Sequence, residues 1–250
     1  MPEYLIIGAQ KCGTSSLYKY LVQHPRIVRA TTKEVGFFDK SFHKGIPWYE
    51  DQFRYGPLWR RLFGLKAGEA TPEYLFNPIV PKRVFDSYPN IKLIALIRDP
   101  VERAYSHYQH MVRHHGETRD FWEALDAELK MDSEVTHRED LLSGNLESLG
   151  YRYQGRGIYI DQIQRWHSVF PSEQLLVLFF EDFIKYPAEA THNVTDFLGL
   201  KPHIVNTGRV HNSGGQYEPM KPETRERLID FFSPHDRRLS EYLGRELPWG

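Results

Sequence analysis

The sequence has a single cysteine, Cys12, among its 250 residues. An internal disulfide is therefore excluded, together with the disulfide-rich class of small secreted scaffolds. The sequence also lacks an apolar run of the about 20 residues that a membrane-spanning helix needs, and it has no stretch typical of a secretion signal. From these absences we expect no membrane span and a location in the reducing cytoplasm.

An excess of charge of one sign is lacking as well. Lys and Arg number 32 against 33 Asp and Glu, which gives a formal net charge of −1. This balance leaves no broad positive field to hold nucleic acid, an anionic membrane or a polyanion nonspecifically, so any anion site has to be local. Repeats, low-complexity tracts and Gly/Ser linkers are absent too, which favours one domain over residues 1–250.

What is present alternates between short apolar runs and helical patterns. Residues 4–7, 92–97 and 174–180 are aliphatic without strict polar alternation, as in strands buried on both faces of a parallel sheet, and a short strand is predicted at 65–67. Helices are predicted over residues 14–23, 78–87, 100–114, 159–170, 187–198 and 223–243. The pattern predicts an α/β domain with a central, mostly parallel sheet flanked by helices. Residues 116–157 are polar and hard to assign.

The residues after the first predicted strand have the composition of an anion-binding loop. Gly8-Ala9-Gln10-Lys11-Cys12-Gly13-Thr14-Ser15 sets two glycines around a turn and hydroxyls at a helix start. Backbone N–H groups, the helix dipole and the charge of Lys11 would converge on one anion. Nucleoside-triphosphate loops carry their lysine after the second glycine, whereas this lysine precedes it. An ordinary turn before a helix is the alternative, and the lysine with the hydroxyls of Thr14, Ser15 and Ser16 favours the anion site.

A second cation follows the predicted strand at 92–97. Asp99 is a candidate magnesium ligand, but Asp99-Pro100-x-Glu102 also has the pattern of a helix start with an N-cap, a first-turn proline and a capping box. The capping interpretation gives Asp99, Pro100 and Glu102 each a role at the helix start. It leaves Arg98 at the carboxyl end of a strand, where open α/β sheets bind ligands. Two cations without a dedicated metal ligand suggest a doubly phosphorylated nucleotide bound without a metal.

The segments GAQKCGTSSLYKYL (8–21) and IRDPVERAYSHYQH (97–110) resemble the cofactor loops of sulfotransferases that use 3′-phosphoadenosine 5′-phosphosulfate (PAPS). Further segments resemble, in the same order, parts of the heparan sulfate N- and 3-O-sulfotransferases: 33–53, 68–78, 155–183 and 217–249. The resemblance covers nearly the whole chain and is weakest over 116–150. It implies a single P-loop-like three-layer domain and metal-independent transfer of a sulfuryl group from PAPS, with 3′-phosphoadenosine 5′-phosphate (PAP) as product.

The resemblance also implies a set of cofactor-binding residues. The 5′-phosphosulfate would be surrounded by Lys11, Cys12, Gly13, Thr14, Ser15 and Ser16. Arg98 and Ser106 would take the 3′-phosphate, although Ser106 also has the position of a helix-surface serine. A glycine- and lysine-rich loop of the family corresponds to residues 211–220, where Ser213, Gly214 and Gly215 replace the expected lysine and arginine, so only backbone contacts are expected there.

Sulfuryl transfer requires charge stabilisation at the leaving phosphate and a base for the acceptor. Lys11 is predicted to neutralise the leaving phosphate, and Lys33 to assist at the sulfuryl oxygens unless it is a surface lysine before a buried Phe pair. Glu69 matches the family's catalytic glutamate as the resemblance implies, with a structural carboxylate at a strand end as the alternative. Relatives carry a lysine after this glutamate, whereas Ala70 stands here, so we expect Glu69 to be less biased toward its ionised form.

Other interpretations remain open at this stage. His107, His110 and His114 share a helix face and could bind a transition metal, or line a cleft or face solvent. Cys12 is either an activated nucleophile or, as we prefer, a small residue that fills the turn. The rival functions are a P-loop nucleotide kinase and a catalytically inactive PAP(S)-binding module. The predicted acceptor is a hydroxyl, less readily an amine, of a saccharide, a small molecule or a carrier-bound chain.

Overall fold

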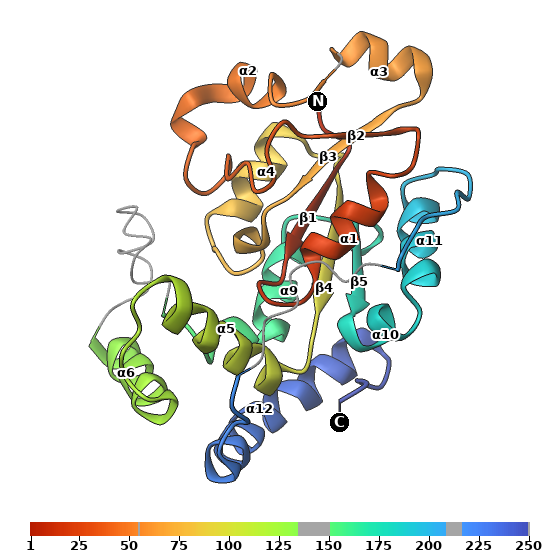
Figure 1. Cartoon of the computed structure of the whole chain (residues 1–250). Helices are drawn as coiled ribbons and strands as arrows, with labels where there is room; N and C mark the ends of the chain where they lie inside the picture. Colours follow the sequence, from red (N-terminus) through yellow and green to blue (C-terminus); the bar gives the residue numbers. More distant parts are fainter. Residues whose placement is uncertain (55, 135–150, 209–216, 250) are drawn as a thin grey trace. The chain divides into compact units, whose positions relative to one another are not determined.

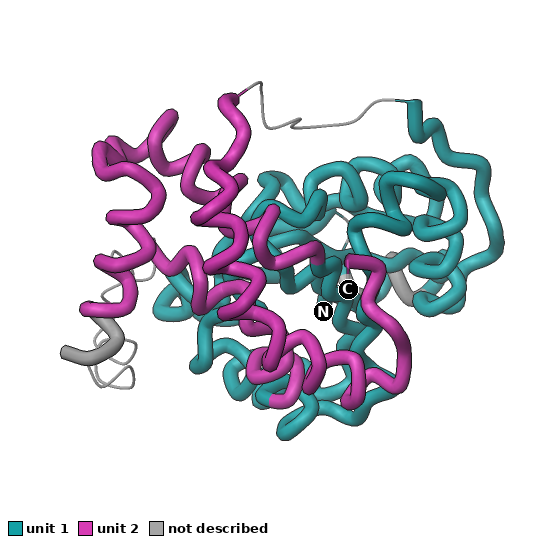
Figure 2. Tube along the Cα trace, turned by 90° about the horizontal axis from the view of Figure 1, so that it is seen from below, with its two compact units in different colours: residues 1–97, 165–213 teal, residues 98–164, 214–250 magenta. Residues whose placement is uncertain are grey.

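A computed structural model gives the structure of residues 1–54, 56–134, 151–208 and 217–249 (Figure 1). Its internal contacts divide the chain into two compact units, residues 1–97 with 165–213 and residues 98–164 with 214–250 (Figure 2). The prediction of a single domain over the whole chain therefore stays a prediction. Ser213, Gly214 and Gly215 lie outside the described residues.

The first unit contains a five-stranded sheet in which every neighbouring pair is parallel, in the order β2-β3-β1-β4-β5. The strands are β1 (Tyr4–Gly8), β2 (Ile27–Arg29), β3 (Lys66–Ala70), β4 (Lys92–Ile97) and β5 (Leu175–Phe179). The apolar runs predicted this arrangement because β1, β4 and most of β5 are buried on both faces. The predicted parallel α/β sheet is thus confirmed, with β2 as a strand that the sequence pattern did not reveal.

Helices cover both faces of this sheet. The unit contains α1 (Thr14–Leu21), α2 (Gly45–Glu50), α3 (Pro57–Phe63), α4 (Val80–Ser87), α10 (Phe180–Lys185) and α11 (Pro187–Phe197). The connection from β1 to β2 runs toward one edge, and the connection from β3 to β4 runs toward the other edge. Because such crossovers are right-handed, α1 and α4 lie on opposite faces (Figure 1). Helix α11 packs on α1, and α1 buries Leu17, Tyr18 and Leu21 as its sequence pattern predicts.

The second unit is helical, with α5 (Pro100–His114), α6 (Phe121–Glu134), the first part of α9 (Tyr159–His167) and α12 (Pro222–Leu243). Its core includes Tyr105, Leu125, Tyr153 and Phe232. Helix α5 begins as predicted, with the Asp99 carboxylate accepting a hydrogen bond from the N–H of Val101 at 2.8 Å.

Glu102, the residue predicted to complete the capping box at the start of α5, takes part in two ion pairs. Glu102 pairs with the guanidinium groups of Arg98 and Arg225. Because Arg225 belongs to α12, this contact joins the start of α5 to the last long helix of the unit. Across the described ranges, no helix is both long enough and apolar enough to cross a bilayer.

Candidate active site

The loop predicted to bind an anion turns at the carboxyl end of β1. The sheet order puts β3 on one side of β1 and β4 on the other, and the connections that follow β1 and β4 leave in opposite directions. In open α/β sheets, ligands bind at such a switch point, outside the carboxyl ends of the strands. The N–H of Ala9 donates to the carbonyl of Leu96 at 2.7 Å, which ties the start of the loop to β4.

Backbone conformation fixes the loop as it enters α1. Lys11 and Gly13 have positive φ angles of 68° and 85°. At Gly13 the requirement for glycine is twofold, because the left-handed backbone is strained for other residues and an added Cβ would lie 2.9 Å from the ring of Phe180. The backbone of the loop is therefore fixed where it enters α1, with Gly13 as the N-cap residue directly before Thr14.

The first turn of α1 has the properties of an anion site. The first N–H groups of a helix have no acceptor within the helix, and the dipole gives that end a partial positive charge. The residues that supply this turn, Thr14, Ser15 and Ser16, add hydroxyl donors and no carboxylate. Lys11 and Ser15 are half-buried, so they keep access to solvent. Cys12 is fully buried and its thiol donates to the carbonyl of Gln10 at 3.6 Å, which favours its interpretation as a residue that fills the turn.

Glu69 lies in β3, beside β1, and its side chain is fully buried. Its Oε1 accepts hydrogen bonds from the hydroxyls of Tyr49 at 3.2 Å and Tyr74 at 2.8 Å. Its Oε2 accepts from the hydroxyl of Thr71 at 2.6 Å and from the N–H of Val35 at 3.3 Å. The carboxylate is thus surrounded by donors from the segments before and after β3.

Burial controls the protonation of this carboxyl group. Desolvation raises the pKa of Glu69 from 4.5 to about 7, against the hydrogen bonds from Thr71, Tyr74 and Tyr49, which lower it. The direction agrees with the expectation that Glu69 is less biased toward its ionised form. The dominant cause of the raised pKa, however, is the removal of water around the side chain of Glu69. The replacement of a lysine by Ala70 did not predict this burial.

The same residues fix the segment that carries Lys33. The N–H of Val35 is held by Glu69, the N–H of Gly36 donates to the hydroxyl of Thr71 at 3.3 Å, and the N–H of Phe38 donates to the hydroxyl of Tyr74 at 3.3 Å. Residues 35–38 are therefore bound to the chain that leaves the carboxyl end of β3.

At the start of this segment, Lys33 forms an ion pair with its neighbour Glu34. Glu34 has a positive φ of 60° and a side chain that is 53% exposed. The segment thus presents an accessible cation and an accessible carboxylate, whereas the carboxylate predicted as the base is enclosed by donors. No sequence pattern distinguished Glu34, although it follows Lys33 directly in the chain.

With this geometry established, similarity to known proteins identifies the family. The sequence matches the family described as "Sulfotransferase domain" over residues 1–225. The chain belongs to the sulfotransferase domain family. Its fold resembles that of a sulfotransferase from Alicyclobacillus acidocaldarius, with a TM-score of 0.75 and 34% sequence identity over 99% of this chain and 97% of that chain.

Curated sulfotransferases of animals are also similar to this chain. It is 30% identical to the human bifunctional heparan sulfate N-deacetylase/N-sulfotransferase 3. The alignment, 282 positions long with its gaps, covers 99% of this chain and 31% of that protein. It is 29% identical to the mouse heparan sulfate glucosamine 3-O-sulfotransferase 3B1, covering 100% of this chain and 65% of the relative. The chain therefore spans only about a third of the bifunctional relative's length. Mouse SULT7A1, solved in complex with PAP, shares the fold with a TM-score of 0.55 at 16% identity.

Two further residues that the family resemblance singles out belong to the second unit. Arg98 is the first residue after β4 and forms an ion pair with Glu102 at 3.7 Å. Ser106 lies two turns into α5 and is 5% exposed. Ser106 is therefore not the helix-surface serine that the sequence allowed as an alternative, and both residues stay predicted ligands of the 3′-phosphate.

The three histidines of α5 do not form one accessible face. His107 is fully buried and packs edge-on against Tyr153, with ring centroids 5.0 Å apart, whereas His114 is exposed and pairs with His110 at 4.9 Å. Among the residues whose placement is described, no group of three His, Cys, Asp or Glu is arranged to hold a metal ion. The interpretation of these histidines as a metal site thus finds no support in the geometry of α5.

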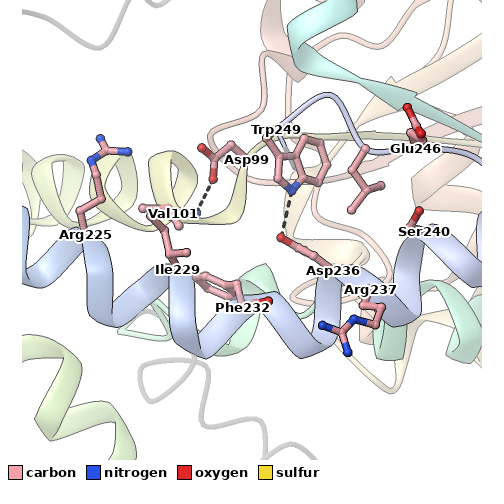
Figure 3. A pocket seen from close by; sticks show the side chains of 12 residues that line it. Asp99, Val101, Arg225, Ile229, Phe232, Asp236, Arg237, Ser240, Glu246 and Trp249 are labelled. Carbon is pink, nitrogen blue, oxygen red and sulfur yellow. Dashed lines mark hydrogen bonds between the residues drawn. The ribbon is translucent and has the colours of Figure 1, made fainter.

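The second unit also contains a cavity of about 710 Å³ between the start of α5, α12 and the C-terminal residues (Figure 3). Asp236 accepts a hydrogen bond from the indole N–H of Trp249 at 3.0 Å in its wall. Desolvation raises the pKa of Asp236 to about 6, and the bond from Trp249 lowers it. No motif in the sequence pointed to this cavity.

Proposed function

We propose that this chain transfers a sulfuryl group from PAPS to an acceptor hydroxyl, less readily an amine, without a metal ion. The observation that carries the proposal is the turn from Gly8 to Ser16, which places Lys11 and three hydroxyl residues beside the start of α1, at the switch point of the sheet. Membership of the sulfotransferase family supports the assignment of the anion as a phosphosulfate. The proposed acceptor is a saccharide, a small molecule or a carrier-bound chain, and the saccharide has the support of the heparan sulfate relatives.

The residues of the loop would hold the donor's phosphosulfate when it is bound. The N–H groups and hydroxyls at the start of α1 would donate to its oxygens, and Lys11 would neutralise the charge that grows on the leaving phosphate. Gly13 would contribute its backbone N–H, whereas the N–H of Cys12 donates to the carbonyl of Ala9 at 3.2 Å, so Cys12 would act by shaping the loop. Arg98 and Ser106 are the proposed partners of the 3′-phosphate, and a bidentate guanidinium suits that role.

The acceptor's proton has two candidate bases. Glu69 was predicted from the sequence and has a pKa near neutrality, which suits a base, but its oxygens are enclosed by four described donors. Glu34 is accessible and is carried by the segment that Glu69 and Thr71 hold. This geometry favours Glu34 as the group that meets the acceptor and Glu69 as the positioning residue behind it.

Calorimetry distinguishes this function from a nucleotide kinase. We expect PAP to bind with equal affinity with and without EDTA, and ATP with magnesium to bind more weakly. Lys11→Ala should weaken PAP binding and, with labelled PAPS and an acceptor panel, lower kcat roughly 100-fold. Tight, magnesium-dependent ATP binding with no PAP binding would replace the proposal by the kinase.

Paired carboxylate variants test the two bases. With Glu34 as base, Glu34→Gln lowers kcat about 100-fold or more with PAP affinity unchanged. Glu69→Gln then lowers kcat by a smaller factor and raises the KM of the acceptor, because the segment loses its anchor. The exposed Glu189 serves as a matched control, since Glu189→Gln should change neither quantity. Full activity in Glu34→Gln together with an inactive Glu69→Gln would return the role of base to Glu69. PAP binding by the wild type without any sulfuryl transfer would support the inactive binding module.

The predicted cytoplasmic location stays part of the proposal.

A further inference from the structure

Helix α3 (Pro57–Phe63) presents large apolar side chains to solvent. Leu58, Trp59, Leu62 and Phe63 are 69%, 57%, 68% and 58% exposed. The other three follow Leu58 by one, four and five residues, which puts all four on one face of the helix. The rings of Trp59 and Phe63 stack, with centroids 5.5 Å apart. Single exposed apolar residues are common on protein surfaces, but four on one short helix mark an interaction surface.

The charge of this region differs from that of the chain. Between Gln52 and Gly68 the sequence has four cations, Arg54, Arg60, Arg61 and Lys66, and no Asp or Glu. The whole chain has a net charge of −1, so this short stretch is a local basic segment. Its partner is therefore expected to be anionic.

A cavity of about 660 Å³ adjoins α3 in the first unit. Trp59 and Phe63 contribute to its wall, together with apolar residues of β2 and its flanks, and its charged residues are Arg29 and Arg54. A cavity whose wall contains apolar side chains and two guanidinium groups suits an amphiphile that has an apolar chain and an anionic head.

This surface is separate from the candidate active site. Ile27 begins β2 and pairs with Lys66, the first residue of β3, and Leu65 of the cavity wall directly precedes it. The cavity therefore lies along the edge strand β2, from Ile27 to Arg29, and beside the start of β3, whereas the anion-binding loop follows the carboxyl end of β1. None of the residues proposed for sulfuryl transfer takes part in it.

We propose that the apolar face of α3, with the cavity beside it, docks on an anionic lipid bilayer. Trp, Phe and Leu side chains with flanking Arg and Lys form the pattern of segments that lie in the membrane interface. A protein partner would be expected to meet a mixed polar rim, but the charged residues in the cavity wall are the cations Arg29 and Arg54. Trp59 and Phe63 enter the headgroup region, and the basic segment is attracted to the lipid phosphates.

Sedimentation with vesicles tests this proposal on the full chain. We expect the protein to pellet with vesicles of phosphatidylcholine and phosphatidylglycerol, to stay in solution with phosphatidylcholine alone, and to be released by salt. The double variant Trp59→Ser/Phe63→Ser should bind at least about tenfold more weakly, because it removes the apolar contribution. Arg54→Gln should weaken binding about fivefold, the effect of one basic residue near an anionic surface.

Matched variants on the same unit provide the controls. Ile204 is 94% exposed and Lys201 is exposed, so Ile204→Ser and Lys201→Gln remove an apolar side chain and a charge outside the surface. Both should bind vesicles like the wild type, and unchanged melting temperatures verify that all variants fold. Equal pelleting of the wild type and Trp59→Ser/Phe63→Ser, or no pelleting at all, overturns the proposal. If sedimentation velocity shows a dimer and the α3 variants abolish it, the surface binds a second copy of this chain instead. Binding to a soluble polyanion that depends on α3 and occurs without vesicle binding also overturns the lipid assignment.

Discussion

The buried carboxyl group of Glu69 makes a quantitative prediction about stability and pH. In the variant Glu69→Gln the group no longer ionises and the side chain keeps its size; its amide oxygen still accepts hydrogen bonds, whereas its NH₂ group donates. The hydroxyls of Tyr49, Thr71 and Tyr74 can rotate to suit the new amide. The comparison of wild type and variant therefore isolates the ionisation of one buried group.

The magnitude follows from the shift of the pKa from 4.5 to about 7. A group whose pKa is raised on folding contributes stability that is fully present below its unfolded pKa and is lost as the pH rises through the folded pKa. The window for Glu69 therefore runs from about pH 4.5 to about pH 7. A shift of this size corresponds to about 3 kcal/mol, and the side chain is fully buried, so solvent does not screen it. Between about pH 5 and about pH 8, most of that amount should be lost.

Urea unfolding followed by circular dichroism measures this loss. The free energy of unfolding of the wild type minus that of Glu69→Gln should fall by about 2 to 3 kcal/mol between about pH 5 and about pH 8. The same difference for the exposed control Glu189→Gln should stay constant. A flat difference for Glu69→Gln would mean that the carboxyl group does not titrate in a dry site, and the argument from burial would fail.

Three further predictions concern the loop and the second unit. Trp249 donates to Asp236, whose pKa burial raises to about 6, so the indole N–H shift of Trp249 should titrate near pH 6 and become pH-independent in Asp236→Asn. Gly13→Ala should lower the free energy of unfolding by at least about 1 kcal/mol, because of the positive φ and the ring of Phe180; an unchanged melting temperature would contradict this. Asp99→Ala should cost about 1 kcal/mol in urea unfolding and Asp99→Asn much less, and equal losses would refute the cap.

The sequence predicted those parts of the fold that are encoded in consecutive residues. Strands β1, β4 and β5 are apolar runs, and α5 begins at a capping residue followed by proline, so local patterns suffice for them. Strand β2 has only three residues, too few for any periodicity, and it exists because it pairs with β3. Helix α3 was missed because its seven residues make fewer than two turns, too few to show a helical period.

The same division holds in the candidate site. The anion-binding loop could be predicted because Lys11, the glycines and the hydroxyls are neighbours in the chain. The surroundings of Glu69 could not, because its donors Val35 and Tyr49 lie 34 and 20 residues away, and only folding brings them together. Sequence resemblance identified the carboxylate, but its burial and its contact with residues 35–38 follow from tertiary structure.

At high pH, the substitution Glu69→Gln should raise stability relative to the wild type and lower activity. This contrast separates a positioning role of Glu69 from a purely structural one. Above about pH 7 the ionised carboxylate opposes folding, so Glu69→Gln becomes more stable relative to the wild type as the pH rises. If the carboxylate holds the segment of Lys33 and Glu34 in place, the variant nevertheless transfers sulfate more slowly at that pH. A loss of activity at a pH where the variant is measured to be at least as stable as the wild type cannot come from unfolding. A residue that only stabilised the fold would instead lose activity and stability together.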